Sequence, residues 1–88
     1  MTQVNDLQSV ELATRVRELM ASTFAMDATE LADDVSQDTC ARWTSLYHMT
    51  LLVVLEDEFG VNFTMDEMTA MTSLPKIVST LQNHSVVV

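Results

Sequence analysis

The chain contains one glycine, Gly60, and one proline, Pro75, among 88 residues. Hairpins and tight turns depend on these two residue types, because glycine supplies positive φ angles and proline fixes turn geometry. Apolar residues make up 48% of the sequence, which is enough for a core, and a chain of this length supports a single core. The composition therefore predicts one all-α domain over residues 1–88.

Apolar residues recur at helical spacing near the start of the chain. The first predicted helix runs from about Ser9, its N-cap, to Phe24. Its predicted buried face has apolar residues three or four positions apart: Val10, Ala13, Val16, Met20 and Phe24. A long polar connection follows from Asp27 to Thr44. Because loops of this length are uncommon in compact domains unless they serve a purpose, we expect this one to be functional.

Capping residues mark the next two helices. The second predicted helix begins after Thr44, whose hydroxyl can accept a hydrogen bond from the first turn. It ends at Gly60, which tolerates the left-handed conformation that terminates helices. A short third helix is indicated by the sequence TMDE, from Thr64 to Glu67, which has the spacing of a capping box.

The fourth predicted helix begins after Ser73 and carries Pro75 in its first turn, where the missing N–H of proline is tolerated. Its predicted buried face consists of Leu74, Ile77, Val78 and Leu81. The helical core therefore covers about residues 9–82, and we expect the C-terminal tail, residues 83–88, to be disordered.

The second predicted helix carries two apolar faces. The expected core face consists of Leu51, Leu52, Leu55 and Phe59. The opposite face combines three apolar residues with two acids: Leu46, Met49, Val53, Glu56 and Asp57. Burial on both sides would explain the second face, but this is difficult to arrange in so short a chain. A docking surface explains it better, with apolar burial on binding and acidic steering of the partner.

Ser45 occupies the first turn of this helix, next to the second apolar face. Thr44 is already a competent cap, so we expect the Ser45 hydroxyl to be free and exposed to solvent. Nucleophilic catalysis would need a neighbouring base and a group that orients it, and the sequence offers only His48 and His84 as bases. We therefore interpret Ser45 as a site modified by another protein, in a chain that is not itself an enzyme.

The segment TSLYHMTLLVVLEDEFG resembles the modification motif of the acyl carrier protein family, and the overlapping LEDEFGVNF is especially similar. In that family a serine at the start of the second helix precedes an apolar run and an acidic cluster that ends in phenylalanine. Ser45 matches the serine that receives 4′-phosphopantetheine from coenzyme A. The resemblance, which covers roughly residues 16–81, implies a small four-helix bundle of acyl-carrier type, with a long loop between helices 1 and 2 and a short third helix.

By the same resemblance, a free-standing carrier holds an acyl or aminoacyl group as a thioester and passes it between enzymes of a specialised pathway, such as lipid or polyketide biosynthesis. The implied partners are a phosphopantetheinyl transferase, a loading enzyme for the acyl or aminoacyl group, and a downstream transferase or synthase. The implied recognition residues are Thr44, Leu46, Met49, Val53, Glu56 and Asp57. The family shelters aliphatic chains between helices 2 and 3. Candidates to line such a pocket are Leu55, Phe59, Val61, Met68 and Met71, for each of which simple core packing is the alternative.

The residue before the modified serine departs from the family motif, because the usual aspartate is replaced by Thr44. Thr44 retains the capping function but lacks the charge that a basic residue of the transferase would meet. We therefore expect slower priming, which is the attachment of 4′-phosphopantetheine to Ser45. The alternative is that priming is lost, which would leave an unmodified adaptor that acts only through protein contacts. We interpret His48 as a hydrogen-bonded interior histidine and Trp43 as a residue that packs the loop onto the helix, and we assign no role to Cys40.

The formal net charge of −9, from 13 acidic and 4 basic side chains, disfavours nucleic acid as a partner because phosphate backbones repel acidic surfaces. Two histidines and one cysteine form no metal-ligand set, and no segment has the spacing of a calcium-binding loop. No apolar run approaches the ~18 residues of a membrane span, and the N-terminus lacks the pattern of a secretory signal. These features lead us to expect a cytoplasmic monomer.

Overall fold

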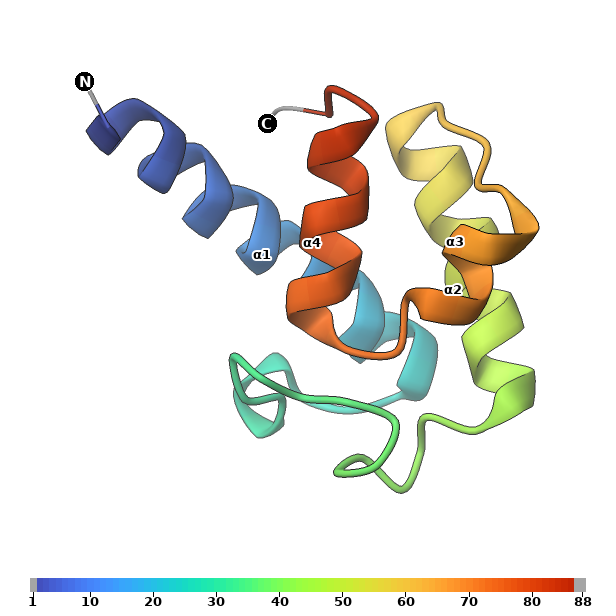
Figure 1. The fold of residues 1–88 in the computed structure, drawn as a ribbon. Coiled ribbons are helices and arrows are strands. Elements are labelled where there is room, and N and C mark those ends of the chain that lie inside the picture. The colour runs from blue at the N-terminus through green and yellow to red at the C-terminus, as the bar shows by residue number, and fades with distance from the viewer. Residues whose placement is uncertain (1, 87–88) are drawn as a thin grey trace.

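The computed structural model describes the backbone of residues 2–86 and the side chains of residues 8–86. Its elements are α1 (Thr2–Phe24), a 3₁₀ turn η1 (Ala28–Glu30), α2 (Ser45–Phe59), α3 (Met65–Ala70) and α4 (Leu74–Asn83). The only β-type pairing within this part of the chain is an isolated bridge between Ser36 and Ser73. The predicted all-α class with four helices, a long first loop and a short third helix is therefore confirmed. Figure 1 shows α1 passing behind α4, with the long loop beneath the bundle.

The first helix is longer than the sequence pattern predicts, because α1 begins at Thr2 and Ser9 lies within it. Nothing between these two residues stops a helix, and serine is tolerated in a helix interior. The helix ends at Phe24, and Ala25 follows with a left-handed φ of 56°. Arg42 donates a hydrogen bond from Nη1 to the Phe24 carbonyl at 3.2 Å, which satisfies one of the free carbonyls at the helix end.

The buried face of α1 begins later than predicted. Leu12, Val16, Met20 and Phe24 have almost no exposed surface, whereas Val10 is 62% exposed. Residues of an α-helix are about 100° apart around its axis, so Val10 lies on the opposite side from Leu12. The assignment of Val10 to the core was therefore wrong. Among the α1 side chains that the structure describes, the buried stripe begins at Leu12, and α1 packs against α2 and α4.

The loop between α1 and α2 is anchored in the core despite its polar composition. Its buried side chains are Leu31, Val35, Cys40 and Trp43. Its backbone pairs with the connection between α3 and α4: the Gln37 N–H donates to the Thr72 carbonyl at 3.0 Å, and the Leu74 N–H donates to the Val35 carbonyl at 2.9 Å. These contacts close the end of the bundle at which α2 begins.

Helix α2 begins and ends where its capping residues predict. The Tyr47 N–H donates to the Thr44 hydroxyl at 3.3 Å, and Gly60 has the left-handed φ of 65° that ends the helix. Such a conformation favours glycine, which has no Cβ to clash with the backbone. Of the predicted core face, Leu51, Leu52 and Leu55 are buried and Phe59 is partly buried.

The signals for the last two helices also predict the structure correctly. The capping box between Thr64 and Glu67 is complete, and Ser73 caps α4 by accepting a hydrogen bond from the Lys76 N–H at 3.2 Å. The buried residues of α4 are Leu74, Ile77, Val78 and Leu81, as predicted. None of the described helices is long and apolar enough to cross a membrane.

Residues 83–86 of the predicted tail make contacts with the bundle in the structure. Asn83 is the last residue of α4, the His84 side chain hydrogen-bonds to Glu67, and Val86 packs against the core. The sequence pattern missed these contacts because Glu67 is distant from the tail along the chain. Residues 87 and 88 of the predicted tail lie outside the described residues.

Candidate functional site

Ser45 is the first residue of α2, and its side chain is exposed. Thr44 precedes it in an extended conformation, with φ −80° and ψ 172°, and its hydroxyl serves as the cap. The Ser45 hydroxyl is therefore not needed for capping. At the start of a helix it lies close to backbone N–H groups that have no partner within the helix, and these groups favour negative charge.

An exposed apolar surface lies beside Ser45. Its large side chains on α2 are Leu46, 74% exposed, Met49, 55% exposed, and Val53, 56% exposed. The predicted second face of α2 thus lies at the surface, and burial of the helix on both sides is excluded. We call these three residues together with Met65 the outer face.

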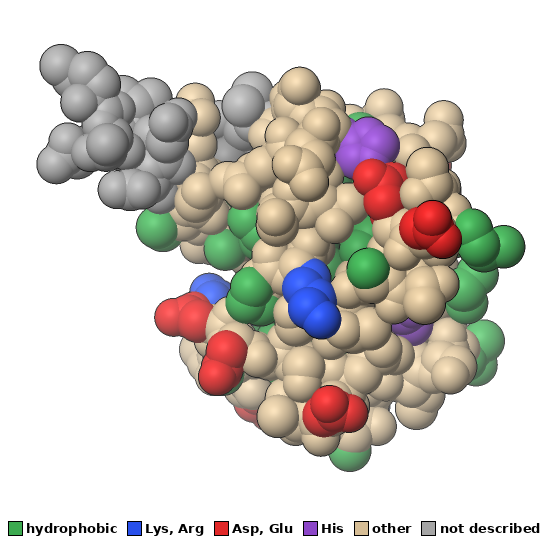
Figure 2. Space-filling model, in the orientation of Figure 1, with side chains coloured by type: hydrophobic (Ala, Val, Ile, Leu, Met, Phe, Trp, Pro, Cys, Tyr) green, Lys and Arg blue, Asp and Glu red, His purple; other side chains and the backbone are tan. Residues whose placement is uncertain are grey.

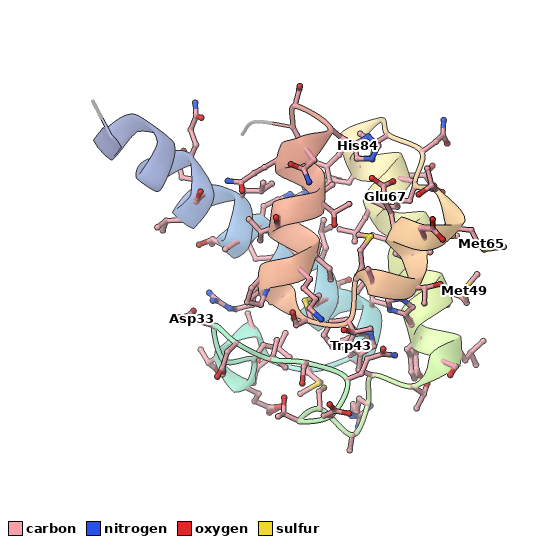
Figure 3. The ribbon with its side chains drawn as sticks, in the orientation of Figure 1. Asp33, Trp43, Met49, Met65, Glu67 and His84 are labelled. Carbon is pink, nitrogen blue, oxygen red and sulfur yellow. The ribbon has the colours of Figure 1, made fainter. Side chains whose placement is uncertain are left out.

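Met65 belongs to the outer face but was missed in the sequence. It is the first residue of α3 and is 77% exposed. Figure 3 shows Met49 and Met65 on the same side of the molecule, pointing away from the bundle, and Figure 2 shows hydrophobic side chains gathered along that edge. The signal was weak, because a single apolar residue after a cap does not reveal which side of a short helix it occupies.

The acidic residues at the end of α2 have different environments. Glu56 is partly buried and accepts a hydrogen bond from the Phe63 N–H at 2.9 Å, so it braces the turn after the helix. Asp57 is exposed. Glu58 accepts a hydrogen bond from Arg15 Nε at 3.0 Å, which ties α2 to α1 and raises the pKa of the Arg15 guanidinium above its ordinary value. Of the two acids predicted to meet a partner, only Asp57 presents a carboxylate without a bracing role.

His48 connects the long loop to α3. Trp43 donates from Nε1 to His48 Nδ1 at 3.0 Å, and the other ring nitrogen lies 2.9 Å from the Met68 carbonyl. Since an indole N–H can only donate, Nδ1 must accept, and Nε2 therefore carries the proton and donates to Met68. The prediction of a hydrogen-bonded histidine is confirmed. Because both ring nitrogens are engaged, His48 is not free to act as a base for Ser45.

Trp43 is buried and packs its ring 5.7 Å from the ring of Phe24, measured between centroids. The loop is thereby fixed to the end of α1 immediately before Ser45. Trp43 also contacts α2, because its ring lies 6.0 Å from the ring of His48, measured between centroids. The prediction that Trp43 packs the loop onto the second helix is therefore confirmed, and its contact with α1 was not predicted.

The five candidate pocket residues have three different environments. Leu55 and Met71 are fully buried, with no exposed surface. Phe59 and Val61 line a hollow of about 390 Å³ at the C-terminal end of α2, which is also lined by His84, Ser85 and Val86. Met68 is partly buried and packs against the core. Leu55 and Met71 do not line this hollow, so the structure does not gather the five residues around it.

Glu67 links α3 to the C-terminal end of α4. Its carboxylate accepts a hydrogen bond from the Thr64 N–H at 2.9 Å, and both oxygens lie 3.0 Å from His84 Nε2. Figure 3 shows the Glu67 and His84 side chains facing one another. The backbone hydrogen bond from Thr64, followed by the contact with His84, lowers the pKa of Glu67 below its ordinary value. The ring of His84 also meets Phe63 edge to face, with centroids 5.7 Å apart.

No protein-family model matches the chain, and the comparison with curated proteins finds no match. Within the part of the chain that the structure describes, no group of three or more His, Cys, Asp or Glu side chains is placed to hold a metal ion.

Proposed function

We propose that the chain is a carrier protein that is modified on Ser45 with 4′-phosphopantetheine and is not itself an enzyme. The observation that carries this proposal is an exposed serine at the first position of α2, beside an exposed apolar face. The modifying enzyme would join the Ser45 oxygen to the phosphopantetheine phosphorus of coenzyme A, with release of adenosine 3′,5′-bisphosphate. The resemblance of the α2 segment to acyl carrier proteins supports the same proposal. The four helices, with a long first loop and a short third helix, agree with the arrangement which that resemblance implies.

The start of α2 suits a phosphodiester. Helix N-termini favour negative charge because their first N–H groups lack partners and the helix dipole is positive there. The first turn reads Ser-Leu-Tyr-His and contains no acid that would repel a phosphate. The anchored loop before Ser45 keeps this end of the helix fixed. The phosphopantetheine group, which forms a flexible arm, is therefore attached at a defined point.

The arm explains why a small chain without catalytic groups is useful. A thiol at the end of a flexible tether holds an acyl or aminoacyl group as a thioester and presents it at high effective concentration to successive enzymes. These enzymes belong, in this proposal, to a specialised biosynthetic pathway of the cytoplasm. The outer face provides apolar area for docking, and the surrounding acids attract basic surfaces on the transferase, the loading enzyme and the downstream enzyme.

The experiment is incubation of the full chain with coenzyme A, magnesium and a broad-specificity phosphopantetheinyl transferase, followed by measurement of the intact mass. The chain should gain the mass of one phosphopantetheine group. Ser45→Ala should abolish the gain without loss of helical circular dichroism, whereas Ser22→Ala, at an exposed serine of α1, should leave the gain intact. A gain that persists in Ser45→Ala would move the site elsewhere and contradict the proposal.

An unmodified adaptor is the second candidate, and Thr44 is the observation that favours it. Where the family usually has an aspartate, this chain has an uncharged cap. If the chain gains no mass with any transferase tested but still binds a pathway enzyme through the outer face, the adaptor is the better description.

A further inference from the structure

A groove lies between α1 and α4 and does not include Ser45 or any residue of the outer face. It encloses about 400 Å³, which falls within the range of about 300–1,000 Å³ that is typical of small-molecule sites. Figure 2 shows hydrophobic side chains along this seam, with basic and acidic side chains close to them.

The walls of the groove are apolar along much of its length. α1 contributes Val10 and Ala13, and α4 contributes Leu74, Pro75 and Val78. From Ser9 to Arg17, the lining residues of α1 span about 12 Å at the helical rise of 1.5 Å per residue. This surface suits a short hydrocarbon chain, since burial of each methylene is favourable.

The two ends of the groove differ. At one end, Gln82 donates from Nε2 to Ser9 Oγ at 2.6 Å, so both side chains are engaged. At the other end, Arg17 pairs through Nη2 with Asp33, a residue of the long loop that is labelled in Figure 3. The groove therefore has a charged end at Arg17 and Asp33, and an uncharged end at Ser9 and Gln82, whose side chains are hydrogen-bonded to each other.

The Arg17 guanidinium is only partly satisfied. Its side chain is 21% exposed and its partner Asp33 is 96% exposed, so this ion pair is held at the surface. Nε of Arg17 is buried, and it has no hydrogen-bond acceptor among the residues that the structure describes. A buried donor without an acceptor is unfavourable, and exposed ion pairs are weak.

We propose that this groove binds a small amphiphilic carboxylate, with its hydrocarbon chain against Val10 and Val78 and its carboxylate on Arg17 in place of Asp33. In this proposal the loop that carries Asp33 moves away from the guanidinium and uncovers Nε. A carboxylate that then approaches side-on accepts from Nε and Nη2 together, and such two-point pairs are stronger than single contacts. Asp33 loses little on release because it is already solvated. Among the described residues, Arg17 is the only basic side chain that lines the groove, so the charge of the head group decides affinity. The binding is non-covalent and does not depend on Ser45.

Titration of the full ¹⁵N-labelled chain with octanoate, followed by amide chemical shifts, tests the proposal. Octanoate should produce saturable shifts at Val10, Ala13 and Val78. It should bind about tenfold more tightly than octanol, because hydrogen bonds to charged groups are stronger than those to neutral ones. Equal affinity for octanol, tighter binding of octylamine, or shifts confined to α2 and α3 would each overturn the proposal.

Variants at the charged end of the groove test two things separately: the contact of the ligand with the Arg17 guanidinium, and the competition between the ligand and Asp33 for that guanidinium. Arg17→Lys keeps the charge but loses the planar fork, and it should weaken octanoate binding about tenfold. Asp33→Asn removes the competing carboxylate and should tighten binding several-fold, whereas Asp34→Asn, a neighbouring exposed acid, should have a smaller effect. If Arg17→Lys fails to fold, the two loop variants still decide, because both positions are exposed. Equal affinities in these two variants would contradict the exchange of Asp33 for the ligand.

Discussion

Thr44 and Ser45 are neighbours with separate tasks at the start of α2. Thr44 satisfies the Tyr47 N–H as the cap, and this leaves the adjacent Ser45 side chain exposed. His48, one turn further on, is held between Trp43 and the Met68 carbonyl. At the residue scale the site thus offers an accessible hydroxyl without a free base beside it, which fits a residue that another enzyme modifies.

The change Thr44→Asp tests how much the missing charge matters. Aspartate and threonine both cap helices, so the free energy of unfolding should change little. Priming of Ser45 should become faster, because the added carboxylate would meet a basic residue of the transferase. Exposed ion pairs contribute ~0.2–1 kcal/mol, so the gain should be several-fold at most and should shrink as salt is added. Priming rates that are the same in both proteins at low and high salt would refute the charge argument.

Glu67 should make stability depend on pH in the acidic range. Because folding lowers its pKa below the ordinary value of 4.5, the ionised carboxylate stabilises the folded chain above that value. This contribution is lost as the pH falls through the lower pKa of the folded state. Glu67→Gln, which keeps an acceptor for the Thr64 N–H, should reduce stability at neutral pH and flatten the loss of stability as the pH falls below the ordinary value of 4.5.

Urea unfolding across this pH range measures the effect of Glu67. Asp66→Asn is the matched control, because it removes one charge from the same helix at an exposed position. If Glu67→Gln and the unsubstituted chain lost stability in parallel on acidification, the contacts with Thr64 and His84 would not be the source.

At the scale of the elements, local signals predicted three helices well and the first one poorly. Thr44, Gly60 and Ser73 act through their own backbone neighbourhood, so short sequence patterns suffice to find the helix ends that they mark. The start of α1 has no such marker, and its core stripe was misread at Val10. The outer face was predicted from helical spacing on α2, but Met65 was not, because its position depends on how α3 packs.

The two faces of α2 should respond differently to truncation. Leu55 is fully buried, so Leu55→Ala should cost about 2–5 kcal/mol, a large part of the stability of a small domain. Val53 is exposed, so Val53→Ala should change the free energy of unfolding by less than about 0.5 kcal/mol. The same variant should weaken docking to the transferase, since a surface side chain contributes once a partner covers it.

Thermal unfolding and the apparent KM for priming, measured on both variants, test whether Leu55 belongs to the core and Val53 to the docking surface. Destabilisation of the free chain by Val53→Ala to the same extent as by Leu55→Ala would show that the outer face is core. An unchanged KM in a stable Val53→Ala protein would remove that residue from the docking surface.

At the scale of the whole molecule, the three arginine side chains are all engaged in contacts within the chain. Arg15 pairs with Glu58, Arg17 pairs with Asp33, and Arg42 donates to the end of α1. With a net charge of −9, the chain therefore presents a predominantly acidic surface to its partners. The sequence predicts the net charge but not these pairings, nor the contact between His84 and Glu67. Each of them joins positions far apart along the chain, and only the packing of the helices brings them together.

The intact mass of the protein purified from its native cells, with peptide mapping of the α2 segment, tests the modification of Ser45 most directly. We predict a chain that carries one 4′-phosphopantetheine group, free or loaded with an acyl or aminoacyl group, on the peptide that contains Ser45. The group should be lost when Ser45→Ala is expressed in the same cells. A native protein with an unmodified Ser45 peptide, in cells whose other carrier proteins are fully primed, would contradict this function.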